Sequence, residues 1–246
     1  MSDQVLREEA DGLVTLTLNR PQKLNALNHA VFKELAAHLE YIEANATKIG
    51  CVVLRGTGRS FCAGHDLDDI AGGNEGLSVS HFETRAIERL SDLPMPVVCV
   101  VQGHCLTGGL ELALGADIII AAESAKFADT HGKWDLVPVW GMSQRLPRRV
   151  GKARAMEMMF TSRTYSGRDA AAMGLANFCV PDAELDAAVA AIAKEILANS
   201  WRNNAANKKL LKDTDGMTEK AGLAHELHRT VGRGNEMGER LAKMRK

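Results

Sequence analysis

The chain has almost no net charge. It carries 30 Lys and Arg residues against 31 Asp and Glu residues, which leaves a formal charge of −1 at neutral pH. Proteins that bind nucleic acids draw much of their affinity from clustered basic side chains that neutralise phosphates. The charge balance gives no support for such a function, and we expect no nucleic-acid partner.

The chain also lacks a long apolar run. No hydrophobic stretch approaches the roughly 20 residues that a membrane-spanning helix needs. Residues 1–9 do not show the basic-then-apolar order of a secretory signal peptide. We therefore expect a soluble protein without a membrane partner.

Cysteine is scarce and irregularly placed. The five cysteines are an odd number, and four of them lie in apolar segments, where a thiol behaves as a small hydrophobic group. Disulfide frameworks of secreted proteins use even, patterned sets. We expect reduced, structural cysteines and a cytoplasmic location. The positions are Cys51, Cys62, Cys99, Cys105 and Cys179.

No internal repeat is visible, but the 246 residues, 46% of them hydrophobic, suffice for one compact domain and a small appendage. Short apolar runs alternate with helical periods, which is typical of an α/β fold. Alternation predicts a strand over Val14–Leu18, and helical spacing predicts a helix over Ala30–Ile42. Continuous apolar runs predict buried strands. These runs are Cys51–Leu54, Val97–Val101 and Asp117–Ala121.

The second half of the sequence is helical. Ser166 and Asp169 fit a capping box, and Gly174 fits the end of that helix. A further helix is predicted over residues 183–198, followed by a helical tail from 203 to 246. We divide the chain into a core, residues 1–198, and a C-terminal helical region, residues 199–246. The apolar residues of this region predict burial against the core or a neighbouring subunit. They are Met217, Leu223, Leu227, Val231, Met237 and Leu241.

Two glycine-containing turns are the candidate ligand-binding elements of the sequence. The first lies at residues 61–67, and the second begins at Gly108, which a buried helix with Glu111 follows. Glycine lets backbone N–H groups approach a ligand oxygen, and two such donors aimed at one point form an oxyanion hole. We expect the backbone N–H groups of His65 and Gly108 to be the donors. For His65, imidazole chemistry is the alternative.

Glu111 is the predicted acid/base. It lies three residues after Gly108, among leucines, and a carboxylate in a buried helix requires a function. The alternative is a solvated glutamate in a first helical turn. Asp66 is better suited to holding its loop through backbone N–H groups than to acting as a base.

Both turns resemble the enoyl-CoA hydratase/isomerase family, or crotonase superfamily, whose members polarise acyl-CoA thioester carbonyls. The resemblance covers most of the chain. The matching segments are residues 16–21, 25–27, 63–67, 103–112 and 144–146, with Pro138, Ala171, Gly174 and Leu175. It implies a crotonase-like spiral of repeated β-β-α turns, whose C-terminal helices pack in a homotrimer or hexamer. Because one scaffold supports hydratases, isomerases, dehalogenases, decarboxylases and thioester hydrolases, the resemblance leaves the reaction open.

The family pattern also implies two catalytic glutamates, and Glu111 matches the first. When Phe127 and Pro138 are aligned without a gap, His131 occupies the position of the second. Histidine exchanges protons near neutral pH, so His131 is expected to assist Glu111. The alternative is a loop histidine in a surface or supporting position. Asp129 and Asp135 flank His131 but would need a register shift to replace the glutamate.

Six residues are expected to contact the substrate: Ala26, Ala63, Asp66, Leu67, Trp134 and Trp140. Core packing is the alternative role for the two tryptophans. A basic cluster further along suggests a solvated helix face, or otherwise a contact with the phosphates of CoA. It comprises Arg145, Arg148, Arg149, Lys152 and Arg154.

These features predict an acyl-CoA enzyme, with reversible hydration of a 2-enoyl-CoA, a lyase reaction, as the leading activity. The alternatives are a double-bond isomerase or decarboxylase of the same superfamily, or a CoA-ester-binding subunit without turnover. No metal, nicotinamide or covalent intermediate is expected. Coenzyme A enters as part of the substrate and is not a separate cofactor.

Overall fold

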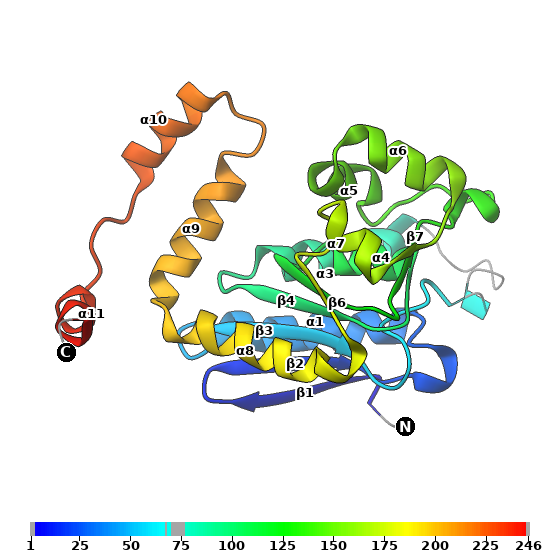
Figure 1. Ribbon diagram of the computed structural model, residues 1–246, viewed down its shortest axis with the longest axis horizontal. Coiled ribbons are helices and arrows are strands. Elements are labelled where there is room, and N and C mark those ends of the chain that lie inside the picture. Colours follow the sequence, from blue (N-terminus) through cyan, green and yellow to red (C-terminus); the bar gives the residue numbers. More distant parts are fainter. Residues whose placement is uncertain (1–2, 67, 70–76, 245–246) are drawn as a thin grey trace.

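Figure 1 shows the computed structural model, which describes residues 3–66, 68–69 and 77–244. The fold is mixed α/β, and its larger sheet has the strand order β1-β2-β3-β4-β6-β9. β1 is antiparallel to β2, whereas the following neighbours are parallel. The strands of this sheet are β1 (Val5–Ala10), β2 (Leu13–Leu18), β3 (Cys51–Gly56), β4 (Val97–Val101), β6 (Ile118–Ala122) and β9 (Phe178–Val180).

A smaller sheet gives the fold its spiral. It has the order β5-β7-β8 and comprises β5 (His104–Leu106), β7 (Lys126–Ala128) and β8 (Tyr165–Ser166). Cys62 extends this sheet, because it forms a parallel bridge with Cys105 of β5. The chain thus passes from a strand of the large sheet to the small sheet and then to a helix, three times over. β3 leads to Cys62 and α3 (Leu77–Asp92), β4 leads to β5 and α4 (Gly108–Ala113), and β6 leads to β7 and α5 (Met142–Val150). The predicted β-β-α spiral is confirmed.

Burial explains which strands the sequence revealed. Every residue of β4 is buried, and β2 alternates between buried and half-buried side chains. The expected strands are all present, within a few residues of their predicted bounds. β1 was not predicted, because all its residues after Val5 are exposed at the sheet edge.

Helices cover both faces of the large sheet. Asn28 caps the start of α1 (His29–Ala44), because its side chain accepts a hydrogen bond from Val31 N. The helix packs against α3. α8 (Leu185–Ala198) contacts β3 and β6 on the opposite face of the large sheet. The predicted capping box at Ser166 and Asp169 begins α7 (Gly167–Ala172). The remaining short elements are η1 (Pro21–Lys23), η2 (His131–Lys133), η3 (Asp182–Glu184) and α6 (Lys152–Thr161).

The C-terminal helices extend away from the sheets (Figure 1). They are α9 (Trp201–Asp213), α10 (Glu219–Arg229) and α11 (Met237–Met244). α9 is anchored by Trp201, whose ring occupies the space that a Cβ at Gly12 or Gly50 would fill, and by the 2.6 Å contact of Lys208 Nζ with Asp117 Oδ2. The six apolar residues expected to be buried are between 41% and 74% exposed. The prediction that these residues pack against the chain's own core is therefore wrong.

The described cysteines are free thiols, and those at 51, 62, 99 and 105 are buried. Burial raises the pKa of Cys51 and Cys62 to about 12, which keeps these thiols protonated. The four buried cysteines are therefore structural, as expected, whereas Cys179 is only partly buried. Among the described residues, no helix combines the length and hydrophobicity that a membrane span requires.

Candidate active site

The two glycine-containing turns lie side by side because the strands before them are paired. Cys62 N donates to His104 O at 2.8 Å, and Leu106 N donates to Cys62 O at 3.1 Å. These parallel segments end at the same edge of the small sheet, so the turns that follow emerge together. A Cβ built on Gly108 would lie 3.4 Å from His65 N. The amides proposed as the oxyanion hole are thus neighbours.

The geometry of both turns disfavours a side chain at the glycine next to the two amides. Gly64 has a φ of +109°, which L-residues rarely adopt. A Cβ on Gly108 would lie 2.4 Å from Cζ3 of Trp140, inside the van der Waals contact distance. Gly108 is the first residue of α4, so its N–H has no acceptor within the helix. A Cβ on Gly64 would lie 3.7 Å from Gly108 N, so glycine at this position keeps a side chain away from that amide.

Thr107 holds the second turn in a strained shape. Its φ of +51° is unfavourable for a β-branched residue. Its N–H donates to Ala128 O at 2.9 Å, and its hydroxyl makes a short hydrogen bond with the hydroxyl of Thr130. The strain is therefore held by β7 and by the loop after it.

Glu111 is buried, with 1% of its surface exposed. Its Oε1 accepts hydrogen bonds from Trp140 N at 2.9 Å and from Met142 N at 3.0 Å. These bonds fix the carboxyl group and leave Oε2 directed toward His131. Burial raises the pKa of Glu111, while the two backbone donors and the imidazole of His131 act in the opposite direction. The alternative of a solvated glutamate is wrong.

His131 points inward from η2 and is 8% exposed. Its Nε2 lies 3.7 Å from Glu111 Oε2, and its Nδ1 lies 2.6 Å from Asp129 Oδ1. The alternative of a surface-loop histidine is therefore wrong. Asp129, which we expected only as a neighbour in sequence, is the buried partner of the ring, while Asp135 is exposed. The spacing of two residues between Asp129 and His131 was the one available signal.

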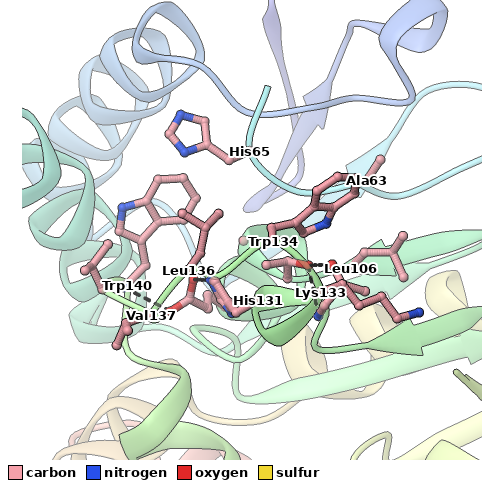
Figure 2. A pocket seen from close by; sticks show the side chains of 14 residues that line it. Ala63, His65, Leu106, His131, Lys133, Trp134, Leu136, Val137 and Trp140 are labelled. Carbon is pink, nitrogen blue, oxygen red and sulfur yellow. Dashed lines mark hydrogen bonds and ion pairs between the residues drawn. The ribbon is translucent and has the colours of Figure 1, made fainter. Parts of the chain in front are cut away.

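Glu111 and His131 line a cavity of about 470 Å³ (Figure 2). Ala63, His65, Gly108 and Thr107 contribute to its wall, so the two turns open into the same space. Its apolar side comes from the loop between η2 and α5. The residues of this side are Trp134, Leu136, Val137, Val139 and Trp140. In Figure 2 the two tryptophans stand on opposite sides of His131. The cavity thus combines the backbone of two glycine-containing turns, a buried carboxyl–imidazole pair and an apolar wall.

The structure brings only some of the expected substrate contacts to this cavity. Ala63, Trp134 and Trp140 line it, whereas Ala26 and Asp66 do not, and Leu67 lies outside the described residues. Trp140 also packs in the core, since its ring lies 4.9 Å from that of Phe32. Trp140 therefore lines the cavity and also packs in the core, and its contact with the substrate stays a prediction.

Asp66 has the structural role predicted for it. It accepts hydrogen bonds from Asp68 N at 3.2 Å and from Arg20 Nη2 at 2.8 Å. The first bond holds the loop locally, and the second ties it to η1. The position of the His65 amide is set by this scaffold.

The basic cluster of α5 and α6 is only partly solvated. Arg145 Nη1 donates to Trp140 O at 2.7 Å, and Arg149 Nη2 donates to Ala116 O at 2.6 Å. These two guanidinium groups brace other elements, so the expectation of a solvated face is wrong for them. Arg148 forms an exposed ion pair with Asp215 of the tail at 2.7 Å, and Lys152 and Arg154 are exposed.

Comparisons with known proteins point to one family. A family model described as Enoyl-CoA hydratase/isomerase matches residues 8–236. The 1,2-epoxyphenylacetyl-CoA isomerase of Escherichia coli K12 is 40% identical over 181 residues, which cover 71% of this chain and 69% of that protein. The crystal structure of an enoyl-CoA hydratase from Bacillus anthracis superposes with a TM-score of 0.93 at 32% identity, covering 98% of this chain and 96% of that one. A Thermobifida fusca YX protein solved with acetoacetyl-CoA has a TM-score of 0.84 at 28% identity, covering 99% and 95%.

Proposed function

The chain belongs to the enoyl-CoA hydratase/isomerase family, and we propose that it adds water reversibly to a 2-enoyl-CoA thioester. One observation carries the proposal: His65 and Gly108 line the same cavity as the buried side chains of Glu111 and His131. The acyl-CoA ligand of the Thermobifida fusca relative supports the choice of substrate class.

In the proposed reaction, the thioester oxygen accepts hydrogen bonds from the N–H groups of His65 and Gly108. These donors stabilise the negative charge that moves onto the oxygen when water attacks the β-carbon. Glu111 accepts the proton of the attacking water, and the imidazolium of His131 donates a proton to the α-carbon. One C–O bond, one C–H bond and the O–H bond of protonated Glu111 form, while the carbon–carbon π bond, one O–H bond of water and the Nε2–H bond of His131 break. Electrons are neither gained nor lost overall, so the reaction requires no cofactor beyond the CoA of the substrate.

The proximity of His131 Nε2 and Glu111 Oε2, 3.7 Å apart, also allows the two side chains to return to their starting protonation states after each turnover. After the reaction, Glu111 holds the proton of water, and His131 is neutral. Because 3.7 Å exceeds hydrogen-bond distance, a proton that returns from Oε2 to Nε2 through a bridging water molecule restores the starting state. The two side chains thus act as a pair.

Double-bond isomerisation is the second candidate. An adjacent acid/base pair can move a proton between two carbons of one acyl chain, and the Escherichia coli relative is named an isomerase. Incubation with a panel of enoyl-CoA and 2-carboxyacyl-CoA esters, followed by liquid chromatography and mass spectrometry, separates the candidates. Hydration adds the mass of one water, decarboxylation removes carbon dioxide, and isomerisation leaves the mass unchanged but changes the chromatographic retention time. Binding without any reaction would instead identify a CoA-ester-binding subunit.

Replacement of His131 is expected to slow hydration and to move its pH dependence. His131→Gln removes a proton donor, so the rate should fall by roughly 10²-fold, a typical effect of acid/base catalysis. His131 opposes the burial that raises the pKa of Glu111, so its loss should raise that pKa further. Because the ionised form of Glu111 is the active base, the acidic limb of the rate profile should move to higher pH. Steady-state rates with crotonyl-CoA across pH 5 to 9 measure both effects.

His131→Glu tests the resemblance to two-glutamate hydratases. It should retain or increase hydratase activity, and it is best combined with Asp129→Asn, because Asp129 would otherwise face a second carboxylate. If His131→Gln hydrates as fast as the wild type at every pH, His131 is a bystander. If only the glutamate variant hydrates, the natural reaction is isomerisation or decarboxylation.

We further propose that the C-terminal helices assemble the chain as a homotrimer or as a dimer of trimers. The exposed apolar side chains of α10, Leu223 and Leu227, support this role, since such residues are costly in water. Deletion of residues 201–246 should dissociate the oligomer or precipitate the protein. The milder variant Leu223→Gln/Leu227→Gln should lower the sedimentation coefficient, while Lys220→Gln on the same helix should not. A truncated protein with unchanged assembly would refute this role.

A further inference from the structure

Asp129 is a buried carboxylate that the proposed reaction does not use directly. It is 1% exposed at the end of β7, just before η2. Within the described parts of the chain, its side-chain hydrogen bonds go to His131 alone. Oδ1 accepts both His131 N at 3.1 Å and His131 Nδ1 at 2.6 Å. A buried charge is costly unless its partners compensate for desolvation, so this pairing calls for a functional explanation.

The contact determines where the imidazole carries its proton. An ionised carboxylate only accepts hydrogen bonds, so Nδ1 at 2.6 Å must be the donor. In the neutral ring the lone pair is then on Nε2. Nε2 is the atom that faces Glu111 Oε2 and the cavity. The backbone bond to the same Oδ1 fixes the carboxylate relative to the start of η2, and thereby fixes the plane of the ring.

We propose that Asp129 is the positioning residue that holds His131 with Nδ1 protonated and Nε2 directed into the cavity. The proton given to the substrate then leaves from Nε2, and the same atom takes the returning proton from Glu111. Without Asp129, the neutral ring is free to adopt the other tautomer or to turn away. The kinetic part of this inference rests on the proposed function, whereas the tautomer and orientation of His131 do not.

The first test needs no turnover. Nitrogen-15 NMR of the full-length protein with labelled histidine, recorded where the ring is neutral, distinguishes a protonated ring nitrogen from one with a lone pair. The His131 signals are identified by their loss in His131→Gln. We expect protonated Nδ1 in the wild type and a mixed or reversed tautomer in Asp129→Asn. The matched control is Asp135→Asn, an exposed carboxylate of the same loop, which should leave the His131 signals unchanged.

The second test is kinetic. Asp129→Asn should lower kcat by roughly 10- to 100-fold, as loss of a partner that orients a histidine commonly does, and leave KM nearly unchanged. Asp135→Asn should match the wild type. If Asp129→Asn misfolds, Asp129→Ser offers a smaller side chain with room for a water molecule, and circular dichroism confirms its fold.

The two measurements separate the possible failures. A wild type that hydrates no enoyl-CoA but shows the expected tautomer overturns the proposed function and leaves the positioning role standing. If folded Asp129→Asn or Asp129→Ser keeps both the wild-type tautomer and the wild-type kcat, the positioning role is overturned. A lone pair on Nδ1 in the wild type also overturns it.

Discussion

Glu111→Gln is expected to lower turnover by roughly 10³-fold, because it removes the group that accepts the proton of water. Glutamine has the same shape, and its side-chain oxygen can still accept hydrogen bonds from Trp140 N and Met142 N. The cavity should therefore be preserved, and the affinity for a non-reactive acyl-CoA analogue should change little. A fall in kcat without a fall in affinity separates a chemical role from a role in binding. Calorimetric titration and steady-state kinetics provide the two measurements.

The same variant should be more stable than the wild type, and the difference should depend on pH. Burial raises the pKa of Glu111 above its ordinary value of 4.5, so the folded protein favours the protonated form. The associated stability is present below pH 4.5 and is lost as the pH rises through the folded-state pKa. Glutamine is neutral at every pH and avoids this loss. The gain in melting temperature should thus be clear at pH 8 and vanish near pH 4.

Glu195→Gln, an exposed substitution on α8, is the matched control for the loss of one carboxylate. It should change neither turnover nor the pH dependence of the melting temperature. If Glu111→Gln turns over substrate at the wild-type rate, Glu111 is a packing residue. If the variant loses activity but also loses stability at pH 8, the carboxylate supports the fold, and its catalytic role is not separable by this substitution.

The sequence predicted the parts of the site that depend on local signals. Gly64 and Gly108 follow apolar runs, and the pairing of Cys62 with Cys105 brings their turns together. Parallel strands deliver their following turns to one edge, so the position of these turns was predictable before their contacts were known. The burial of Glu111 was predictable from its sequence neighbours, because the adjacent leucines indicate a buried helix.

The parts that the sequence did not reveal depend on contacts between elements or on elements too short to leave a pattern. The helical spacing of Arg145 and Arg149 predicts a solvated face. Their guanidinium groups instead donate hydrogen bonds to carbonyl groups outside their own helix. β5 has three residues, too few for a periodic signal. The pairing of Asp129 with His131 requires the turn of η2 to direct both side chains inward, and neighbouring loop-like residues conceal that turn.

Removal of the Gly108 amide is expected to have the second large effect. Gly108→Pro deletes one of the two proposed donors to the thioester oxygen, and loss of one such donor commonly costs 10²- to 10³-fold in kcat. Proline is compatible with the first residue of a helix, where the N–H is not needed for helical hydrogen bonding. The stretching frequency of the thioester carbonyl, measured by Raman difference spectroscopy on bound acyl-CoA, should be lowered less in the variant than in the wild type.

Gly108→Ala is the control that isolates the amide. Both variants introduce a Cβ, which would lie 2.4 Å from Trp140 Cζ3, so both force a movement of that ring. Only proline also lacks the N–H, and the difference between the two variants therefore reports on the hydrogen bond. At the other donor, His65→Ala keeps its backbone amide and should retain much of the activity. A folded Gly108→Pro variant with the kcat and carbonyl frequency of Gly108→Ala would show that Gly108 N–H does not bind the substrate oxygen. Because the two amides lie within one cavity beside Glu111, the thioester would then have to bind in another orientation, with its α-carbon farther from the acid/base pair.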